Sequence, residues 1–180
     1  TYLFYHNGAL PGGGGFHRSV CVDEMKFNPD GSVVQMNMTK EGAAPVATLN
    51  PYKRVEAETI AWESGVKTAK SGDVGVYVTD IHDGAFIRVC SVDFGDKGAS
   101  EFLASVASVT DGGAIELRLD GPSGELIGTL KVNPTGASDK WKTQTCRASG
   151  AKGVHDLYLK FTGNSLPLMN FDWWKFEQIK

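Results

Sequence analysis

Two glutamates separated by a single residue, Glu56 and Glu58, form the most chemically suggestive pair in this sequence. Side chains alternate between the two faces of an extended strand, so a strand over residues 54–60 would point both carboxylates to the same side. Two like charges held that close need a partner. The spacing therefore suits either an acid and base pair or a ligand set for a hard cation such as Ca²⁺, which prefers oxygen donors.

A third carboxylate, Asp172, lies near the end of the chain in the aromatic run NFDWWKF at 170–176. If the strand around Glu56 pairs with this last strand, Asp172 joins the two glutamates and completes an oxygen site. Paired glutamates on an edge strand are often simply solvated, and that alternative stays open at this point. On the residues alone the solvated pair is the simpler interpretation, and a structural calcium that ties a first strand to a last one is the alternative.

The composition limits the classes of partner. The chain has 180 residues and a formal net charge of -3. Nucleic acid is not an expected partner, because the sequence has no dense run of Lys and Arg that could neutralise backbone phosphates. No apolar stretch reaches the ~18 residues that span a bilayer, so we expect no membrane partner. The length is sufficient for one domain with a packed core and a short appendage.

Short strands must position these carboxylates. From residue 52 onward, strand-like segments recur at the spacing typical of a sandwich, and turns rich in Gly and Pro separate them. Alternation at 114–120 and 154–161 indicates half-buried strands, and no segment has convincing helical periodicity. We therefore predict an all-β fold, a sandwich of two antiparallel sheets. Its expected strands cover residues 54–60, 74–79, 85–94, 100–110, 114–120, 126–132, 140–147, 154–161 and 168–178.

The beginning of the chain predicts a β-hairpin appendage. Strand-like segments at 19–27 and 32–38 flank the turn sequence NPDG at 28–31, which is typical of a hairpin. A piece of this size cannot bury a core alone. Small residues and two prolines then indicate a linker. We divide the chain into an appendage at 1–42, a linker at 43–51 and a domain at 52–180.

The three cysteines, Cys21, Cys90 and Cys146, have no metal-binding spacing and leave one thiol over in any disulfide scheme. Free, buried thiols are the simplest interpretation, because unpaired cysteine is commonly buried. A bridge between Cys90 and Cys146 is the alternative. Neither arrangement fixes the compartment.

Residues 52–180 resemble a family 6 carbohydrate-binding module, a β-sandwich of the jelly-roll type. The resemblance rests on VEAE at 55–58, YVTDIHDG at 77–84, IELRLDG at 115–121, GTL at 128–130, PTG at 134–136, GVHDLYLKF at 153–161 and FDWWKF at 171–176, in the order of the family. It implies that Glu56, Glu58 and Asp172 hold a structural calcium together with backbone carbonyls before Tyr77.

The first segment is similar to the last blade of a family 43 glycoside hydrolase propeller, through YHNGALP at 5–11 and RSV at 18–20. Enzymes of that family, which includes arabinofuranosidases and xylosidases, often carry such a module behind the propeller. The resemblance implies that the catalytic carboxylates lie in earlier blades and that this piece has no catalytic residue. It also implies a secreted protein, with the missing propeller as a partner in cis.

Sugar binding in the family depends on aromatic rings that stack on a pyranose, with polar side chains nearby that bond its hydroxyls. Alignment with the family motifs puts the two ring positions of the main cleft at Asp80 and Ser138 and its asparagine at Asn164. The asparagine of the cleft is therefore kept, and both of its aromatic rings are replaced by other residues.

Other aromatic residues are candidates for the lost rings. Trp173 and Trp174 are neighbours in a predicted strand and must face opposite sides, and we favour Trp173 for an outer sheet face that binds sugar. Tyr77 and Trp62 are further candidates at a cleft rim, with packing as the simpler alternative. Trp141 is expected to pack in the core.

The resemblance supports two functional interpretations. The first is a non-catalytic, calcium-stabilised module that targets a family 43 hydrolase to xylan or arabinoxylan, a plant cell-wall polysaccharide, or to its oligosaccharides. The alternative is a structural module that packs on the hydrolase and stabilises it with little or no sugar binding. The replaced rings at Asp80 and Ser138 favour the alternative.

Overall fold

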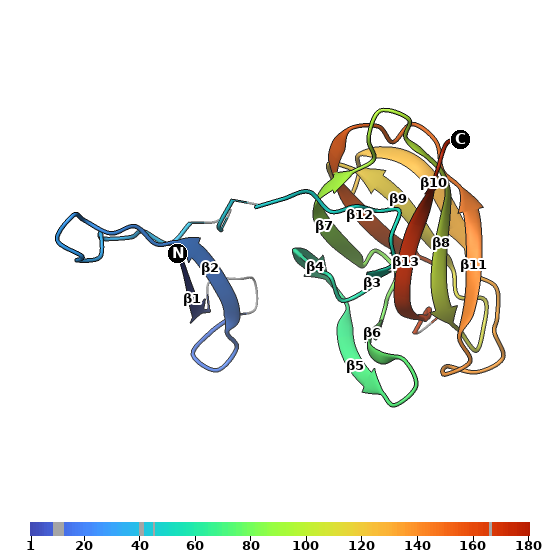
Figure 1. The fold of residues 1–180 in the computed structure, drawn as a ribbon. Helices are drawn as coiled ribbons and strands as arrows, with labels where there is room; N and C mark the ends of the chain where they lie inside the picture. The colour runs from blue at the N-terminus through green and yellow to red at the C-terminus, as the bar shows by residue number, and fades with distance from the viewer. Residues whose placement is uncertain (9–12, 40–41, 45, 166) are drawn as a thin grey trace. The chain divides into compact units, whose positions relative to one another are not determined.

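The computed structural model describes residues 1–8, 13–39, 42–44, 46–165 and 167–180 in two compact units, Thr1–Val46 and Ala47–Lys180. Both units consist of β-strands and connections (Figure 1). The predicted all-β class is confirmed, and the described part of the chain has no helix that could cross a membrane. Part of the hydrolase-like motif at 5–11 and Pro45 of the expected linker lie outside the described residues.

The first unit is built on one antiparallel hairpin. Strand β1 (Tyr2–Asn7) pairs along its whole length with β2 (Ser19–Glu24). Asp23 is buried beside them and accepts hydrogen bonds from the hydroxyls of Thr39 and Tyr5, the latter at 2.5 Å. These hydrogen bonds lower the pKa of the Asp23 carboxyl, and the same contact raises the pKa of Tyr5 to about 12. One buried carboxylate thus connects the hairpin to the segment that follows it.

The turn expected at 28–31 forms, but its arms are shorter than the sequence suggests. The amide of Gly31 donates to the carbonyl of Asn28 at 2.9 Å, and Phe27 pairs with Val33 as an isolated bridge. The chain pairs β2 with β1 instead, so the strand expected at 32–38 is reduced to that bridge.

The second unit is the expected sandwich of two antiparallel sheets. One sheet, the β12 sheet, has the order β10-β9-β12-β7-β4, and the other, the β13 sheet, has the order β11-β8-β13-β6-β5, with β3 also paired to β13. The strands are β3 (Val55–Glu56), β4 (Trp62–Ser64), β5 (Lys67–Ser71), β6 (Gly75–Thr79), β7 (Phe86–Asp93), β8 (Ala99–Ala107), β9 (Ala114–Leu119), β10 (Glu125–Lys131), β11 (Lys142–Arg147), β12 (Val154–Thr162) and β13 (Asn170–Gln178).

Three strands differ from the prediction. Of the strand expected at 54–60, only β3 forms, because the chain turns at once: the amide of Thr59 donates to the carbonyl of Glu56 at 3.0 Å. The sequence does not predict β4 or β5, which are edge strands of the two sheets. Strand β5 has the polar sequence KTAKS, and an edge strand of this kind has no alternating apolar face.

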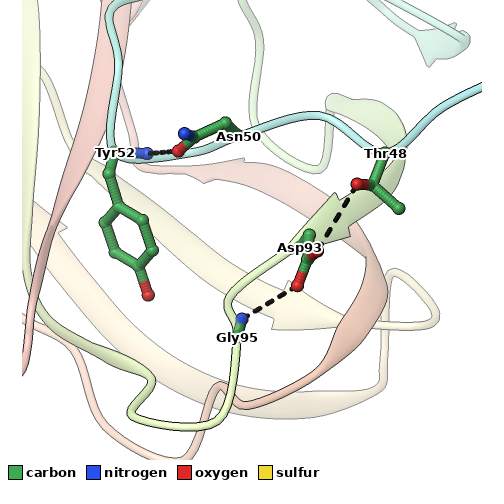
Figure 2. A pocket seen from close by; sticks show the side chains of 5 residues that line it. All are labelled: Thr48, Asn50, Tyr52, Asp93 and Gly95. Atoms are coloured by element: carbon green, nitrogen blue, oxygen red, sulfur yellow. Dashed lines mark hydrogen bonds between the residues drawn. The ribbon is translucent and has the colours of Figure 1, made fainter.

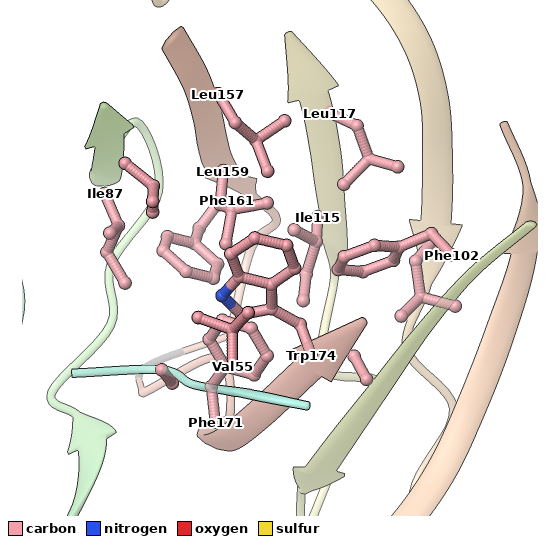
Figure 3. Close-up of a cluster of buried hydrophobic side chains, with 14 of the residues drawn as sticks. Val55, Ile87, Phe102, Ile115, Leu117, Leu157, Leu159, Phe161, Phe171 and Trp174 are labelled. Carbon is pink, nitrogen blue, oxygen red and sulfur yellow. The ribbon is translucent and has the colours of Figure 1, made fainter. Parts of the chain in front are cut away.

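The core fills the space between the sheets. Trp174 is fully buried, with its ring centre 6.3 Å from that of Phe102 and 5.9 Å from that of Phe176. Figure 3 shows apolar side chains of both sheets gathered around this indole. From the β12 sheet these include Ile87, Ile115, Leu117, Leu157, Leu159 and Phe161. Because these residues alternate along their strands, the side chains between them point to the outer face of the sheet.

The segment that leads into the sandwich is attached to β7 before it reaches β3. The amide of Leu49 donates to the carbonyl of Ser91 at 2.8 Å, and the amide of Asp93 donates to the carbonyl of Leu49 at 2.9 Å. The hydroxyl of Tyr52 then donates to the carbonyl of Phe94 at 2.7 Å. This attachment precedes any strand of the sandwich.

The three cysteines are unbridged, so the alternative disulfide between Cys90 and Cys146 does not form. Burial raises the pKa of the Cys146 thiol to about 11 and also raises that of Cys90. Both thiols therefore stay protonated at neutral pH, which makes them poor nucleophiles.

A polar network holds the irregular register between β7 and β12. Asp156 accepts hydrogen bonds from the Arg88 guanidinium at 2.6 and 3.1 Å and from the amide of Ser91, a residue with φ +54°, at 3.0 Å. Asp120 accepts from the amide of Asp156 at 3.0 Å and lies 2.7 Å from Nδ1 of His155.

We expect His155 to make the stability of this unit depend on pH. Its hydrogen bond with Asp120 raises the pKa of His155 above the ordinary value, so folding favours the charged ring. This stabilisation is complete below the unfolded pKa of about 6.5 and is lost as the pH rises through the folded pKa. The melting temperature should therefore fall by about 1–2 °C as the pH rises through the folded pKa. The effect is small because the pair is partly exposed.

The His155→Gln variant should lack this decline, and His17→Gln, which changes an exposed histidine of the first unit, should keep it. A nuclear magnetic resonance titration that gave His155 a pKa at or below about 6.5 would contradict the expectation.

Candidate functional site

The pairing expected between the first and last strands of the sandwich is present. Glu56 of β3 lies opposite Trp173 of β13, and the amide of Ala57 donates to the carbonyl of Asp172 at 2.8 Å. Asp172 occupies an irregularity in the pairing of β13 with β8, and its side chain is 3% exposed. We call Glu56, Glu58 and Asp172 the acidic trio. Glu58 follows the end of β3, so its position depends on the turn at Glu56 rather than on strand alternation.

Arg54 is the cation that contacts the acidic trio. Its guanidinium donates two hydrogen bonds to Glu56, at 2.9 Å from Nε and 2.8 Å from Nη2, and Nη2 lies 3.7 Å from Asp172 Oδ1. The hydrogen bonds to Glu56 are the main reason why the pKa of Arg54 is raised, and Asp172 and Glu58 add smaller contributions. The guanidinium carbon lies 5.4 Å from the ring centre of Trp173. A single side chain therefore pairs with Glu56, lies within ion-pair distance of Asp172 and covers an indole.

Two oxygens of the acidic trio are buried without a hydrogen-bond donor, Asp172 Oδ1 and Glu58 Oε2. Burial also raises the pKa of Asp172. Such oxygens fit a hard cation such as Ca²⁺, which takes several carboxylate oxygens at flexible geometry. As the side chains stand, no three potential metal-binding side chains surround one point in the described part of the chain. The donor set is chemically suitable, but Glu56 is occupied by Arg54.

The residues at the two expected ring positions both contact neighbours, Asp80 through its side chain and Ser138 through its backbone carbonyl. Asp80, at φ +54°, lies 2.8 Å from Lys67 Nζ and 3.2 Å from His82 Nε2. The hydrogen bond and charge of Lys67 lower the pKa of Asp80. The carbonyl of Ser138 accepts a hydrogen bond from the side-chain amide of Asn170 at 2.7 Å.

A cavity of about 430 Å³ opens between the loops that follow β8, β10 and β12. Ser138 and Asn170 belong to its wall, and its described lining contains no aromatic ring. The amide oxygen of Asn170 accepts from the hydroxyl of Thr79 at 2.7 Å, so this side chain joins the end of β6 to the loop that contains Ser138. Asn164, the asparagine expected here, is exposed and is not among the described residues of the wall. Sequence reasoning missed Asn170, although it begins the last strand next to Asp172.

The expected aromatic candidates lie in different surroundings. Trp174 is in the core, and Trp173 is partly exposed on the other side of β13 beneath Arg54. The rings of Tyr77 and Trp141 meet edge to face, with their centres 5.3 Å apart. Trp141 is half-buried against Tyr77 rather than in the core between the sheets, and its Nε1 is buried without a hydrogen-bond partner.

A further aromatic group, which sequence reasoning did not assemble, lies on the outer face of the β12 sheet. The neighbours of Phe86 and Tyr158 along each strand are buried, so both rings point outward, and their centres are 5.7 Å apart. Trp62, which is 42% exposed, lies opposite Arg88, and Arg88 lies opposite Tyr158. Directly opposed residues of antiparallel strands share a face. We call Trp62, Phe86 and Tyr158 the aromatic platform.

Charged side chains flank the aromatic platform. Arg88 pairs with Asp156 at 2.6 Å, and Arg118, which lies opposite Tyr158, pairs with Glu116 at 2.8 Å. Lys160 lies opposite Phe86. Rings that stack on an apolar sugar face, beside fixed polar groups that bond hydroxyls, are what carbohydrate recognition requires.

A smaller polar cavity of about 290 Å³ lies where the segment leading into the sandwich meets the end of β7 (Figure 2). It is lined by Thr48, Asn50, Tyr52, Asp93 and Gly95. Asp93 accepts hydrogen bonds from the Thr48 hydroxyl at 3.4 Å and from the Gly95 amide at 2.9 Å. The residues that line this cavity bond one another and so attach the incoming segment to the end of β7.

Comparisons with known proteins match both units. The family model described as Carbohydrate binding module (family 6) matches residues 56–178. Arabinoxylan arabinofuranohydrolase from Bacillus subtilis (strain 168) is 42% identical over 98% of this chain, which spans only 36% of that protein.

Solved structures also match the fold. A glycoside hydrolase family 43 arabinoxylan arabinofuranohydrolase from Bacillus subtilis, in complex with cellotetraose, has a TM-score of 0.91 at 41% identity, over 99% of this chain and 38% of that chain. A family 6 carbohydrate-binding module from Clostridium cellulolyticum, in complex with xylose, has a TM-score of 0.70 at 41% identity, over 72% of this chain and 100% of that chain.

Proposed function

Because this chain belongs to the family 6 carbohydrate-binding modules over residues 56–178, we propose that it binds xylan or arabinoxylan and directs a family 43 hydrolase to that polymer. The module relative in complex with xylose and the arabinofuranohydrolase relative support this choice of polymer. The matches confirm both resemblances that the motifs suggest. The family is one of non-catalytic binding modules, so we assign the catalytic carboxylates to a propeller linked in cis and the whole protein to the extracellular space.

The aromatic platform carries this proposal. The loop-end cavity offers no ring, and its Asn170 amide is already bonded on both sides. The platform instead presents Phe86 and Tyr158 close together and partly exposed, with Arg88 and Lys160 beside them. A pyranose stacked on these rings would have charged hydrogen-bonding groups at its edge.

Affinity electrophoresis and calorimetry test the proposal with xylan, arabinoxylan and xylo-oligosaccharides, with mannan as the unrelated polymer. We expect retardation by xylan and arabinoxylan and none by mannan. The second candidate function is the structural module that packs on the hydrolase, which the replaced rings at Asp80 and Ser138 favour. Absence of binding to every xylan ligand would leave that second function standing.

We also propose a structural calcium held by the acidic trio, supported by the unpaired buried oxygens of Glu58 and Asp172. When bound, the ion would supply the positive charge that links the start of the sandwich to β13. A chelator should lower the melting temperature by about 5–15 °C, as expected for loss of a ligand present well above its Kd. Asp172→Asn should remove this response, and Asp93→Asn should keep it. An identical melt with calcium and with chelator would exclude the ion.

A further inference from the structure

Some carboxylate oxygens of the acidic trio accept hydrogen bonds from Arg54, and others have no hydrogen-bond donor. Both oxygens of Glu56 accept hydrogen bonds from the guanidinium. Asp172 Oδ1 is 3.7 Å from Nη2, too far for a hydrogen bond, and Glu58 Oε2 has no donor. Arg54 therefore acts on Asp172 by its charge alone and leaves the buried oxygen of Asp172 without a ligand.

We propose that Arg54 is the internal counter-ion of the acidic trio, and that it competes with calcium for Glu56 and Asp172. This inference rests on the calcium assigned above to the acidic trio. Two cations that share the same carboxylates repel each other, so a divalent ion at Asp172 Oδ1 disfavours the guanidinium at Glu56. The competition explains why three ligands do not meet at one point while Arg54 is in place.

Arg54 is exposed enough for its guanidinium to move away from the acidic trio. The side chain of Arg54 is 49% exposed and that of Glu56 is 46% exposed, whereas that of Asp172 is only 3% exposed. An exposed arginine can turn into water at little loss, because exposed ion pairs contribute little net stability. The buried carboxylate cannot move in this way and keeps its need for a cation.

Release of Arg54 has a consequence for Trp173. The guanidinium lies over this indole at 5.4 Å, and Trp173 is partly exposed on the outer side of β13. Calcium binding would therefore uncover an aromatic face on the β13 sheet, the sheet opposite to the aromatic platform. The ion would govern access to this ring as well as stability.

The first test is calcium titration calorimetry of the full chain and of Arg54→Gln. Loss of the competing charge should tighten calcium binding about three- to tenfold and should increase the calcium-induced rise in melting temperature. Arg54→Lys keeps the charge without the bidentate fork and should lie between the two, which keeps the test valid if Arg54→Gln folds poorly.

Lys142→Gln is the matched control. Lys142 is exposed on β11, and β8 separates this strand from β13 in the same sheet. This variant should bind calcium as the unaltered chain does. Equal affinity of Arg54→Gln and the unaltered chain would overturn the competition and leave the calcium site intact. Absence of calcium binding in every variant would overturn both.

The second test is tryptophan fluorescence during the same titration. Calcium should change the emission of the unaltered chain, because the cation over Trp173 is withdrawn. The change should disappear in Trp173→Phe and in Arg54→Gln. A change of the same size in Trp173→Phe would show that the signal comes from another indole, and it would refute the release of Arg54 from Trp173.

Discussion

Tyr158→Ala is expected to weaken xylan binding at least about 30-fold, which corresponds to about 2 kcal/mol. Tyr158 and Phe86 are the close ring pair of the aromatic platform, and a sugar that stacks on one of them contacts the other. Phe86→Ala should have an effect of similar size. Calorimetry with a xylo-oligosaccharide measures both, after circular dichroism has shown that the variants are folded.

Two further variants sharpen this test. Tyr158→Phe keeps the ring and should retain most of the affinity, which separates stacking from a hydroxyl contact. Tyr77→Ala removes a ring that packs on Trp141 at the other sheet and should leave binding unchanged. If Phe86→Ala and Tyr158→Ala both bind normally, while Tyr77→Ala or Asn170→Ala does not, the sugar binds elsewhere.

Trp174→Ala is expected to lower the free energy of unfolding by about 3–5 kcal/mol. Trp174 is fully buried and contacts Phe102 and Phe176, so the smaller residue leaves a cavity between the sheets. Its Nε1 has no hydrogen-bond partner, so Trp174→Phe removes an unsatisfied group and should cost much less. Urea denaturation measures these differences.

Trp173→Ala is the matched control, because it removes the same side chain at the next position of the same strand. Trp173 is partly exposed, so we expect a loss of at most about 1 kcal/mol. An equal or larger loss for Trp173→Ala would contradict the assignment of the two indoles to opposite sides of β13.

Strands with an alternating apolar face could be predicted from the sequence alone. Ile115, Leu117 and Leu119 mark β9 because burial on one face requires that period. Strand β5 could not be found in this way, since an edge strand of Lys and Thr has no buried face of its own. The turn after Glu56 was equally hidden, because neither glycine nor proline occurs there.

The acidic trio was partly predictable, because pairing of a first strand with a last one follows from a closed sandwich. The role of Arg54 could not be predicted from the sequence, because it depends on the direction of one long side chain. The sequence does contain a signal of the aromatic platform, because Phe86 and Tyr158 each lie between two residues of the core. Their meeting depends on β7 lying beside β12, which no local pattern specifies.

The attachment of Leu49 to β7 decides how mechanical load would travel through the bound protein. Under the proposed function, a hydrolase that pulled on this segment while the module held the polymer would draw first on the hydrogen bonds between Leu49 and β7. That strand also carries Phe86, so tension would pass from linker to sugar within one sheet. The short pairing of β3 with β13 lies off this path. The pairing of β3 with β13, which closes the sandwich, would then bear none of the strain of anchoring an enzyme.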